Sequence, residues 1–433
     1  MIKSFTQTLP NGLRVVCCEM PHLHAAELAV YLKVGGRNDP AGKEGISHFL
    51  EHILFRGTKD FSSSLAIETE FEAIGGAPNA ATDAESTCYY SRVHPNHFRR
   101  GMEIFASMLL RPLLDGIEIE KRIITEEARE DLNEKGQEIS PDNIASRLLW
   151  PRHPLGNPTI GSLDSIASID RADLEAHLGR FYVANNAVVV IAGAVSSQQV
   201  FAAAGEIFGL WPARQLPAVN NVSKRDHKPL IRFVRDSDSQ INLQLAFLGI
   251  SRSDRHFMAL RLLRRMLAGG GSSRLHLRLR EELGIVYSVE ASLAAYDETG
   301  CLAIDLSTAP DTLNLAVEST LAELRLVVTE GAVPEAELDR VRQAYIFDLD
   351  YSRDSAYEMG VRYGWGELMG ILRGIEEDQQ EARGIMVADL QETARLILAP
   401  ENLRLVAVGP WKNSMKKRIG ELVEQYAGEF KKI

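Results

Sequence analysis

Residues 45–58 read GISHFLEHILFRGT, and the rest of the sequence is best understood from this stretch. If it is helical, His48, Glu51 and His52 project from one side, because positions i, i+3 and i+4 are neighbours on a helix surface. The apolar residues around them indicate a core-facing helix, in which two imidazoles and a carboxylate would lose their hydration. A metal ion compensates for that loss, and imidazole is a common ligand of Zn²⁺. The pattern therefore predicts a zinc site, with a hydrogen-bonded core or surface cluster as the alternative.

The composition is that of an ordinary globular protein, with 45% hydrophobic and 25% charged residues. A chain of 433 residues is too long for one ordinary core, so two domains of roughly 200 residues each are expected. The net charge of −11, with no long basic block, argues against nucleic-acid binding. No apolar run of 18 residues is present, which argues against a membrane span.

The amino-terminal and cysteine patterns both bear on the compartment. The opening residues MIKSFTQTLPNGLRVV contain no apolar segment of the kind that secretion signals have. The four cysteines show neither the spacing of a disulfide framework nor that of a cysteine zinc site, and free buried thiols are expected. These features predict a cytoplasmic protein.

The two halves of the sequence repeat one order of expected elements: strands, helices, a strand pair, further helices, and a terminal strand and helix. A proline-bearing polar stretch separates the halves, and we place the linker at residues 216–228. The sequence thus predicts an α+β protein of two structurally similar domains, 1–215 and 229–433. Each is expected to be a mainly antiparallel sheet packed with helices, as in an internal duplication.

A catalytic zinc ion normally has three protein ligands, so a third ligand must come from elsewhere in the chain. The acidic segment 117–134 is strongly helical in pattern and supplies candidates. Glu120 and Glu127 are two helical turns apart on one face, whereas Glu126 and Glu130 point in other directions. Spacing alone does not choose among these carboxylates.

The inverted order HxxEH is the inverzincin signature, and residues 45–58 resemble the pitrilysin, insulysin and mitochondrial processing peptidase family. In that family a downstream glutamate completes the zinc site, and a second glutamate seven residues before it supports the site. Glu127 follows His52 by 75 residues, and Glu120 precedes Glu127 by seven. The resemblance therefore implies Glu127 as the third ligand and Glu120 as its support, with Glu126 as the fallback.

The segment Asn79-Ala80-Ala81-Thr82 is similar to the family's edge strand, which takes up the substrate as an added strand. An exposed edge can bind an extended peptide through backbone hydrogen bonds, so it tolerates varied side chains. The resemblance implies that Asn79 and Ala80 contact the substrate. The alternative is an ordinary edge strand.

In the second half, residues 269–289 read GGGSSRLHLRLREELGIVYSV and resemble the family's substrate-gripping segment. Its arginine and tyrosine, seven apart, correspond to Arg280 and Tyr287. Both side chains can donate hydrogen bonds, so they could hold a peptide carbonyl or the oxyanion formed on it. The alternative is a helix ended by Gly284, with the tyrosine in a core strand. A phosphate-binding loop is not indicated, because the Lys-Ser/Thr step of that motif is missing.

Together these segments predict a zinc-dependent endopeptidase that hydrolyses peptides or unfolded polypeptide segments. One Zn²⁺ per chain would be held by His48, His52 and Glu127, and Glu51 would act as general base on zinc-bound water. The first domain would carry the metal and the second the substrate-contacting Arg280 and Tyr287.

The chain is similar in length to the half-length bacterial members of that family, which pair to enclose a chamber. We therefore expect a homodimer, with a heterodimer possible. The alternative function is a non-catalytic scaffold of the same fold, or the partner subunit of a heterodimeric peptidase. The second half contains no HxxEH motif of its own, as in that family's second domains.

Overall fold

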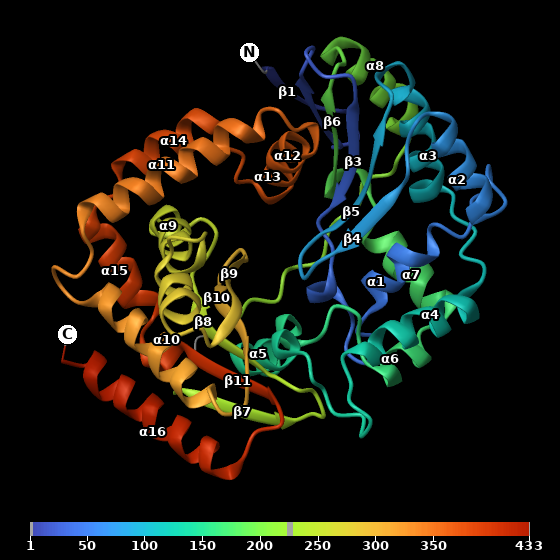
Figure 1. Cartoon of the computed structure of the whole chain (residues 1–433). Helices are drawn as coiled ribbons and strands as arrows, with labels where there is room; N and C mark the ends of the chain where they lie inside the picture. The colour runs from blue at the N-terminus through green and yellow to red at the C-terminus, as the bar shows by residue number, and fades with distance from the viewer. Residues whose placement is uncertain (1–2, 223–227, 433) are drawn as a thin grey trace. The chain divides into compact units, whose positions relative to one another are not determined.

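The computed structural model describes residues 3–222 and 228–432, which form two compact units (Figure 1). Unit 1 comprises Met1–Ala128, Asn157–Asn220 and Asp350–Gly374. Unit 2 comprises Arg129–Gly156, Asn221–Leu349 and Ile375–Ile433. Part of the expected linker 216–228, namely residues 223–227, lies outside the described residues.

Unit 1 is built on a six-stranded sheet in the order β1-β2-β6-β3-β5-β4. Strands β2 and β6 run parallel, and the other neighbours are antiparallel. The central strands are apolar on both faces, as the buried run AVVVIAG of β6 shows. The strands are β1 (Lys3–Thr8), β2 (Arg14–Glu19), β3 (Ala26–Leu32), β4 (Asn79–Thr82), β5 (Thr87–Val93) and β6 (Ala187–Gly193).

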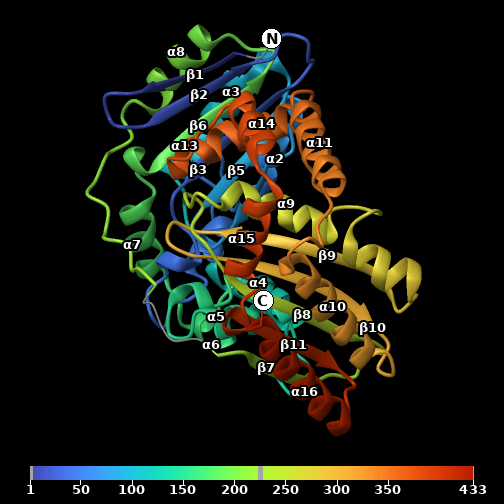
Figure 2. The same cartoon turned by 90° about the vertical axis from the view of Figure 1, so that its left-hand side faces the viewer.

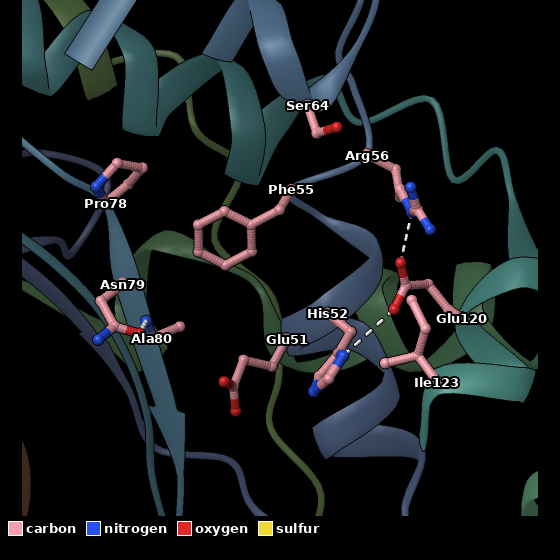
Figure 3. Close-up of a pocket in the computed structure, with 10 residues that line it drawn as sticks. All are labelled: Glu51, His52, Phe55, Arg56, Ser64, Pro78, Asn79, Ala80, Glu120 and Ile123. Atoms are coloured by element: carbon pink, nitrogen blue, oxygen red, sulfur yellow. Dashed lines mark hydrogen bonds and ion pairs between the residues drawn. The ribbon is translucent and has the colours of Figure 1, made fainter. Parts of the chain in front are cut away.

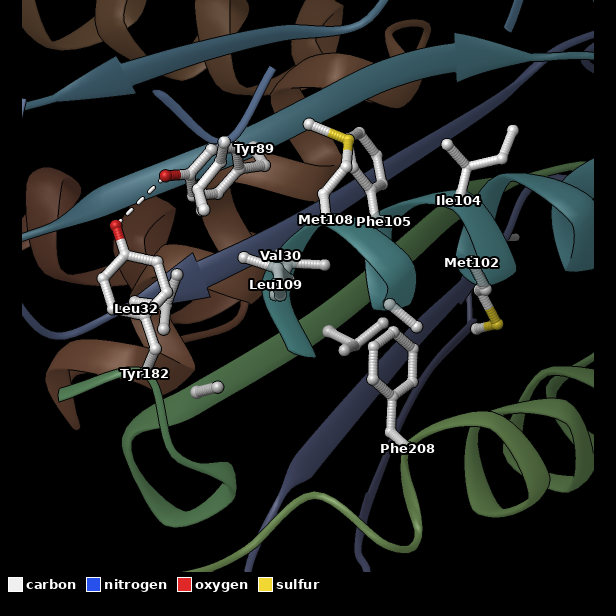
Figure 4. Packing of buried hydrophobic residues seen from close by; sticks show 14 of the residues in the cluster. Val30, Leu32, Tyr89, Met102, Ile104, Phe105, Met108, Leu109, Tyr182 and Phe208 are labelled. Atoms are coloured by element: carbon white, nitrogen blue, oxygen red, sulfur yellow. Dashed lines mark hydrogen bonds between the residues drawn. The ribbon is translucent and has the colours of Figure 1, made fainter. Parts of the chain in front are cut away.

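One face of this sheet is covered by the main core of unit 1. Figure 4 shows Leu109 of the third helix beside Val30 of β3, and Phe105, Met108 and Phe208 belong to the same buried cluster. The hydroxyl of buried Tyr89 is hydrogen-bonded to that of Tyr182 at 3.0 Å, which satisfies both polar groups. The helices of this region are α1 (Ile46–Ile53), α2 (Ser64–Ala73), α3 (Phe98–Leu110), α4 (Ile117–Glu130), α6 (Leu163–Ser168), α7 (Arg171–Phe181) and α8 (Ser197–Phe208).

The opposite face of the same sheet is covered by a segment from late in the chain. Helix α12 (Ala356–Gly360), a π-helical turn (Val361–Trp365) and α13 (Gly366–Met369) contact β3 and β6. Gly364 permits this close approach, because a Cβ atom there would lie 2.6 Å from the side chain of Val190.

Unit 2 has a five-stranded sheet in the order β7-β11-β8-β10-β9. This order repeats β2-β6-β3-β5-β4 strand for strand, including one parallel pair, β7 with β11. The strands are β7 (Leu230–Arg235), β8 (Ile241–Gly249), β9 (Val286–Ala295), β10 (Gly300–Thr308) and β11 (Leu403–Gly409). The structure confirms the predicted α+β class with two similar sheet-and-helix units.

Helices cover both faces of the second sheet as well. Figure 2 shows α10 and α16 side by side over one face, and α9 lies against β9. Helix α5 (Pro141–Leu149) covers the other face, on β8 and β11. The remaining helices are α9 (Phe257–Ala268), α10 (Leu313–Val328), α11 (Glu335–Ser352), α14 (Ile375–Gly384), α15 (Val387–Ile397) and α16 (Asn413–Phe430).

The two units exchange segments along the chain. Residues 129–156 belong to unit 2, and residues 350–374 belong to unit 1. The two consecutive domains predicted from the sequence, 1–215 and 229–433, did not include this exchange, and those boundaries stay a prediction. Within the described residues, no helix is both long and apolar enough to cross a membrane.

Candidate metal centre

Helix α1 carries the HxxEH residues and is fixed at its start by close packing. Gly45 precedes the helix with φ at +93°, and a Cβ atom there would lie 2.3 Å from the carbonyl oxygen of Ile160. Only glycine fits such a position. Phe49, Leu50 and Ile53 are buried in the core of unit 1. The other side of the helix presents His48, Glu51 and His52, as the helical period predicts.

A buried polar cluster holds the first turn of α1. The carboxylate of Asp39 accepts hydrogen bonds from the backbone N–H of Gly45 (2.7 Å) and from the hydroxyl of Ser47 (2.6 Å). His177 Nε2 lies 3.0 Å from the same hydroxyl. Burial raises the pKa of Asp39 to about 7, against hydrogen bonds from Ser47 that lower it, and burial lowers the pKa of His177 to about 4. Asp39 therefore caps α1 from a preceding loop, and His177 donates to Ser47 as a neutral imidazole.

Two imidazoles and a carboxylate converge beside α1. Nε2 of His48 lies 3.7 Å from Oε1 of Glu127, and Nε2 of His52 lies 3.7 Å from Oε2. One ligand atom from each residue lies within 4.8 Å of the others. Among the described residues, this is the group that could hold a metal ion, and the fallback Glu126 is not part of it.

The donor set of this group fits zinc. Two imidazole nitrogens with one carboxylate oxygen form a known catalytic zinc set that leaves a fourth position open. Burial and the neighbouring His52 lower the pKa of His48 to about 4, so its imidazole is neutral at physiological pH. A neutral imidazole keeps the lone pair that a metal ligand needs.

Glu120 contacts the ring nitrogen of His52 that does not face Glu127. Its side chain is buried, with the residue only 5% exposed, and lies 3.2 Å from Nδ1 of His52 (Figure 3). Arg56 donates a second, short hydrogen bond to the same carboxylate. Burial would raise the pKa of Glu120, but His52 and Arg56 outweigh it and the pKa is lowered. The ionised carboxylate keeps the proton of His52 on Nδ1, so Nε2 is free to face Glu127.

Glu51 lies one helical turn after His48 and directly precedes His52, and its side chain reaches strand β4. Its Oε2 accepts a hydrogen bond from the hydroxyl of Thr82 at 2.5 Å. Burial raises the pKa of Glu51, while the hydrogen bond from Thr82 and the charge of His52 oppose that shift. A partly desolvated carboxylate beside the metal group is suited to accept a proton near neutral pH.

A pocket of about 410 Å³ opens beside these residues (Figure 3). Glu51 and His52 lie on one side, and Asn79 and Ala80 of β4 lie on the other. Strand β4 is the last strand of its sheet, so its outer edge presents backbone groups that no neighbouring strand pairs. The other lining residues are Phe55, Arg56, Ser64, Pro78, Glu120 and Ile123.

The sequence-predicted pair in the second half lies in unit 2. Arg280 belongs to a π-helical segment, His276–Glu282, and Tyr287 lies at the start of edge strand β9. The guanidinium of Arg280 is 5.5 Å from the centre of the Tyr287 ring, and Tyr287 is 84% exposed. The two side chains are therefore neighbours, and the tyrosine is not a core residue.

Three contacts of this site were not foreseen from the sequence. They are the hydrogen bond from Thr82 to Glu51, the ion pair between Arg56 and Glu120, and the capping of α1 by Asp39. Arg56 and Thr82 lie inside segments that the sequence analysis quoted, so only their contacts were missed. Asp39 had no signal beyond a turn-forming Asp-Pro pair.

Comparison with known proteins identifies the family. Residues 14–162 match the family model described as insulinase, peptidase family M16, and residues 168–345 match that of the peptidase M16 inactive domain. An uncharacterised zinc protease of Mycobacterium bovis is 30% identical over 90% of each chain. One of Bacillus subtilis is 28% identical over 95% of this chain and 98% of its own.

The same likeness extends to solved structures. A protease from Helicobacter pylori has a TM-score of 0.87 at 22% identity, covering 95% of this chain and 100% of that one. Identity this low shows a shared fold and no more. With two family models along the chain and relatives matched over nearly its whole length, the protein belongs to peptidase family M16, the insulinase family.

Proposed function

We propose that this chain is a zinc-dependent endopeptidase that hydrolyses peptides or unfolded polypeptide segments. The observation that carries the proposal is the convergence of His48, His52 and Glu127, with Glu51 and the edge strand β4 beside them. Family membership supports a peptidase role, and the naming of relatives as zinc proteases supports zinc as the metal.

His48, His52 and Glu127 would hold one Zn²⁺ per chain, with Glu120 fixing the orientation of His52. A bound zinc ion supplies a Lewis acid that makes water far more acidic and polarises a peptide carbonyl. Glu51 accepts the proton of the attacking water and then delivers a proton to the departing amine.

The peptide would add to the edge of β4 as a further antiparallel or parallel strand, held by backbone hydrogen bonds near Asn79 and Ala80. Binding of this kind reads the backbone more than the side chains, so it requires an extended peptide. Arg280 and Tyr287 would donate hydrogen bonds to a substrate carbonyl or to the developing oxyanion.

We also propose that two chains pair around a chamber, as a homodimer or with a related chain as a heterodimer. A cytoplasmic location is proposed as well, supported by four cysteines that are all free thiols. The competing function is a non-catalytic scaffold or partner subunit of the same fold. The complete set of His48, Glu51, His52 and Glu127 favours catalysis over that role.

The test is zinc-dependent cleavage of a quenched peptide library by the purified chain. Activity should disappear with a chelator, return with zinc, and be absent in Glu51→Gln, which keeps the metal ligands. Cleavage that persists in Glu51→Gln, or after complete zinc removal, would contradict the proposal. A zinc-loaded chain that cleaves only after a second family member is added would identify a heterodimer.

A further inference from the structure

The hydroxyl of Thr82 is committed to the carboxylate of Glu51. It donates to Oε2 of Glu51 at 2.5 Å, and its other hydroxyl neighbour is Thr87, 3.4 Å away. Thr87 donates its own proton to the carbonyl oxygen of Val34 at 2.8 Å. A hydroxyl has only one proton to donate, so neither threonine can donate to the other while these bonds are made.

Strand β4 presents Thr82 to α1 while its backbone forms the edge of the sheet. Asn79 and Ala81 are exposed, whereas Ala80 and Thr82 are half-buried on the opposite face, and β4 contacts α1. This alternation is the ordinary two-residue period of a strand. One four-residue strand therefore has both an unpaired outer edge and a hydroxyl aimed at Glu51.

We propose that Thr82 is a positioning residue that holds the carboxylate of Glu51 in one orientation, so that a peptide added to β4 meets a base already in place. This inference rests on the proposed function. Glutamate has three rotatable side-chain bonds, and binding one carboxylate oxygen fixes them. Oε1 of Glu51 has no hydrogen-bond partner among the described residues, so it stays available to accept a proton.

The same strand thereby contributes to two steps of catalysis. Its backbone edge sets the position of the substrate, and its last side chain sets the position of the base. The substrate-binding edge and Thr82 belong to one strand, and its pairing with β5 sets their spacing. Thr82 does not itself line the pocket, and among the described residues it makes no hydrogen bond to His48, His52 or Glu127, which separates its role from that of the metal ligands.

The test compares Thr82→Val with Thr82→Ser. Valine keeps the branched shape that a strand favours but removes the hydroxyl, whereas serine keeps the hydroxyl. We expect Thr82→Val to lower kcat about 10- to 100-fold, the range of one hydrogen bond to a charged group, with KM changed by no more than about 3-fold. Thr82→Ser should restore most of kcat. Zinc affinity, measured by competition with a chelator, should be unchanged in both variants.

Thr87→Val is the matched control, because it removes a buried hydroxyl from the same strand pair without touching Glu51. It should lower thermal stability while keeping kcat. Equal losses of kcat in Thr82→Val and Thr87→Val, or a failure of serine to restore kcat, would overturn the positioning role. If Thr82→Val does not fold, Thr82→Ala with the same expected loss replaces it.

Wild type and Glu51→Gln are measured first, which separates the test of the proposed function from the test of the role of Thr82. If wild type shows no zinc-dependent cleavage, the proposed function is overturned and the role of Thr82 with it. If wild type is active and Thr82→Val keeps full kcat, only the role of Thr82 is overturned. A crystal structure of Thr82→Val should show the Glu51 carboxylate displaced from its present position.

Discussion

Helices α1 and α9 hold the same place in the two units, yet only α1 carries a candidate metal site. Each follows an inner strand, β3 or β8, and precedes the strand pair that forms one edge of its sheet. A His-Phe pair lies near the start of each helix: residues 48–49 are inside α1, and in the pair 256–257 His256 is the N-cap residue of α9. Aligned on that pair, Ala259 and Leu260 take the places of Glu51 and His52.

The replacements turn a polar helix face into an apolar one. Ala259 and Leu260 are 1% and 2% exposed, so α9 is held by packing where α1 has an open pocket. His256, the counterpart of His48, has a hydrogen-bond partner at each ring nitrogen. Its Nδ1 lies 2.9 Å from Asp254, and its Nε2 lies 3.2 Å from Glu392. The same helix position thus serves packing in unit 2 and lines the candidate metal site in unit 1.

The test with the largest expected effect replaces His52 of α1 with leucine, the residue at the corresponding position of α9, Leu260. His52→Leu should fold, because leucine is accepted at the corresponding position of α9, but it should lose zinc and all peptide cleavage. The reason is that two donors cannot hold zinc as three do. Zinc content by atomic emission and cleavage of a quenched peptide check the result.

The control for that variant is His97→Leu, which removes an exposed histidine that lies outside the metal group. It should keep both zinc and activity. If His52→Leu retains stoichiometric zinc, the assignment of α1 as the metal helix is wrong, whatever the effect on activity.

A second test removes the Glu120 carboxylate that contacts His52 and leaves the three proposed ligands intact. Glu120→Gln should weaken zinc affinity about 10- to 100-fold, because the amide no longer stabilises the Nδ1 proton of His52 as a carboxylate does. Chelator competition measures the affinity. Glu118→Gln, on the exposed side of the same helix, should leave affinity unchanged; equal effects of the two would show that only the net charge matters.

Unit 2 should contribute to the reaction without contributing to metal binding. Tyr287→Phe keeps the ring beside Arg280 but loses the hydroxyl, so kcat/KM should fall about 10-fold while zinc content stays at the wild-type level. Tyr351→Phe, another exposed tyrosine, is the control and should behave as wild type. An unchanged kcat/KM in Tyr287→Phe would remove the tyrosine from the proposed site.

The sequence alone predicts those features of the site that depend on residues close together in the chain. The helical period places His48, Glu51 and His52 on one side of α1, and the small polar residues of β4 indicate an edge strand. Contacts between residues far apart in the chain could not be predicted in this way. The hydrogen bond between Thr82 and Glu51, 31 residues apart, depends on how β4 packs on α1. Likewise, an amphipathic pattern shows that α5 has a buried face but not which of two similar sheets it covers.

The carboxylates of the two units also differ in their partners. In unit 1, His52 and Arg56 hold the pKa of Glu120 low. In unit 2, Asp305 shares a pocket of about 290 Å³ with Asp142 and Glu290. Burial, with the charges of those two carboxylates, raises the pKa of Asp305 to about 6, although Gln244 donates a hydrogen bond to it at 2.7 Å.

The smallest expected effect follows from this raised pKa. Below about pH 4 the carboxyl is protonated in both the folded and unfolded chain, so it does not favour either state. As the pH rises from about 4 to 6, the unfolded chain ionises first, and the folded state loses stability relative to it. Above about pH 6 the carboxylate is ionised in both states, and the full loss of folding stability is reached. Asp305→Asn keeps an oxygen that can accept from Gln244 but removes the charge, so it should stabilise the protein at pH 8 and not at pH 4.

We expect a gain of about 1 kcal/mol at pH 8, less than the full pKa difference implies, because solvent screens a partly exposed carboxylate. Urea unfolding at pH 4 and pH 8 measures it, with Asp311→Asn as the control on an exposed aspartate of the same unit. A gain of equal size at both pH values would mean that packing, and not charge, is responsible. The contrast between an ionised carboxylate held by positive partners in unit 1 and one repelled by other carboxylates in unit 2 would then no longer hold.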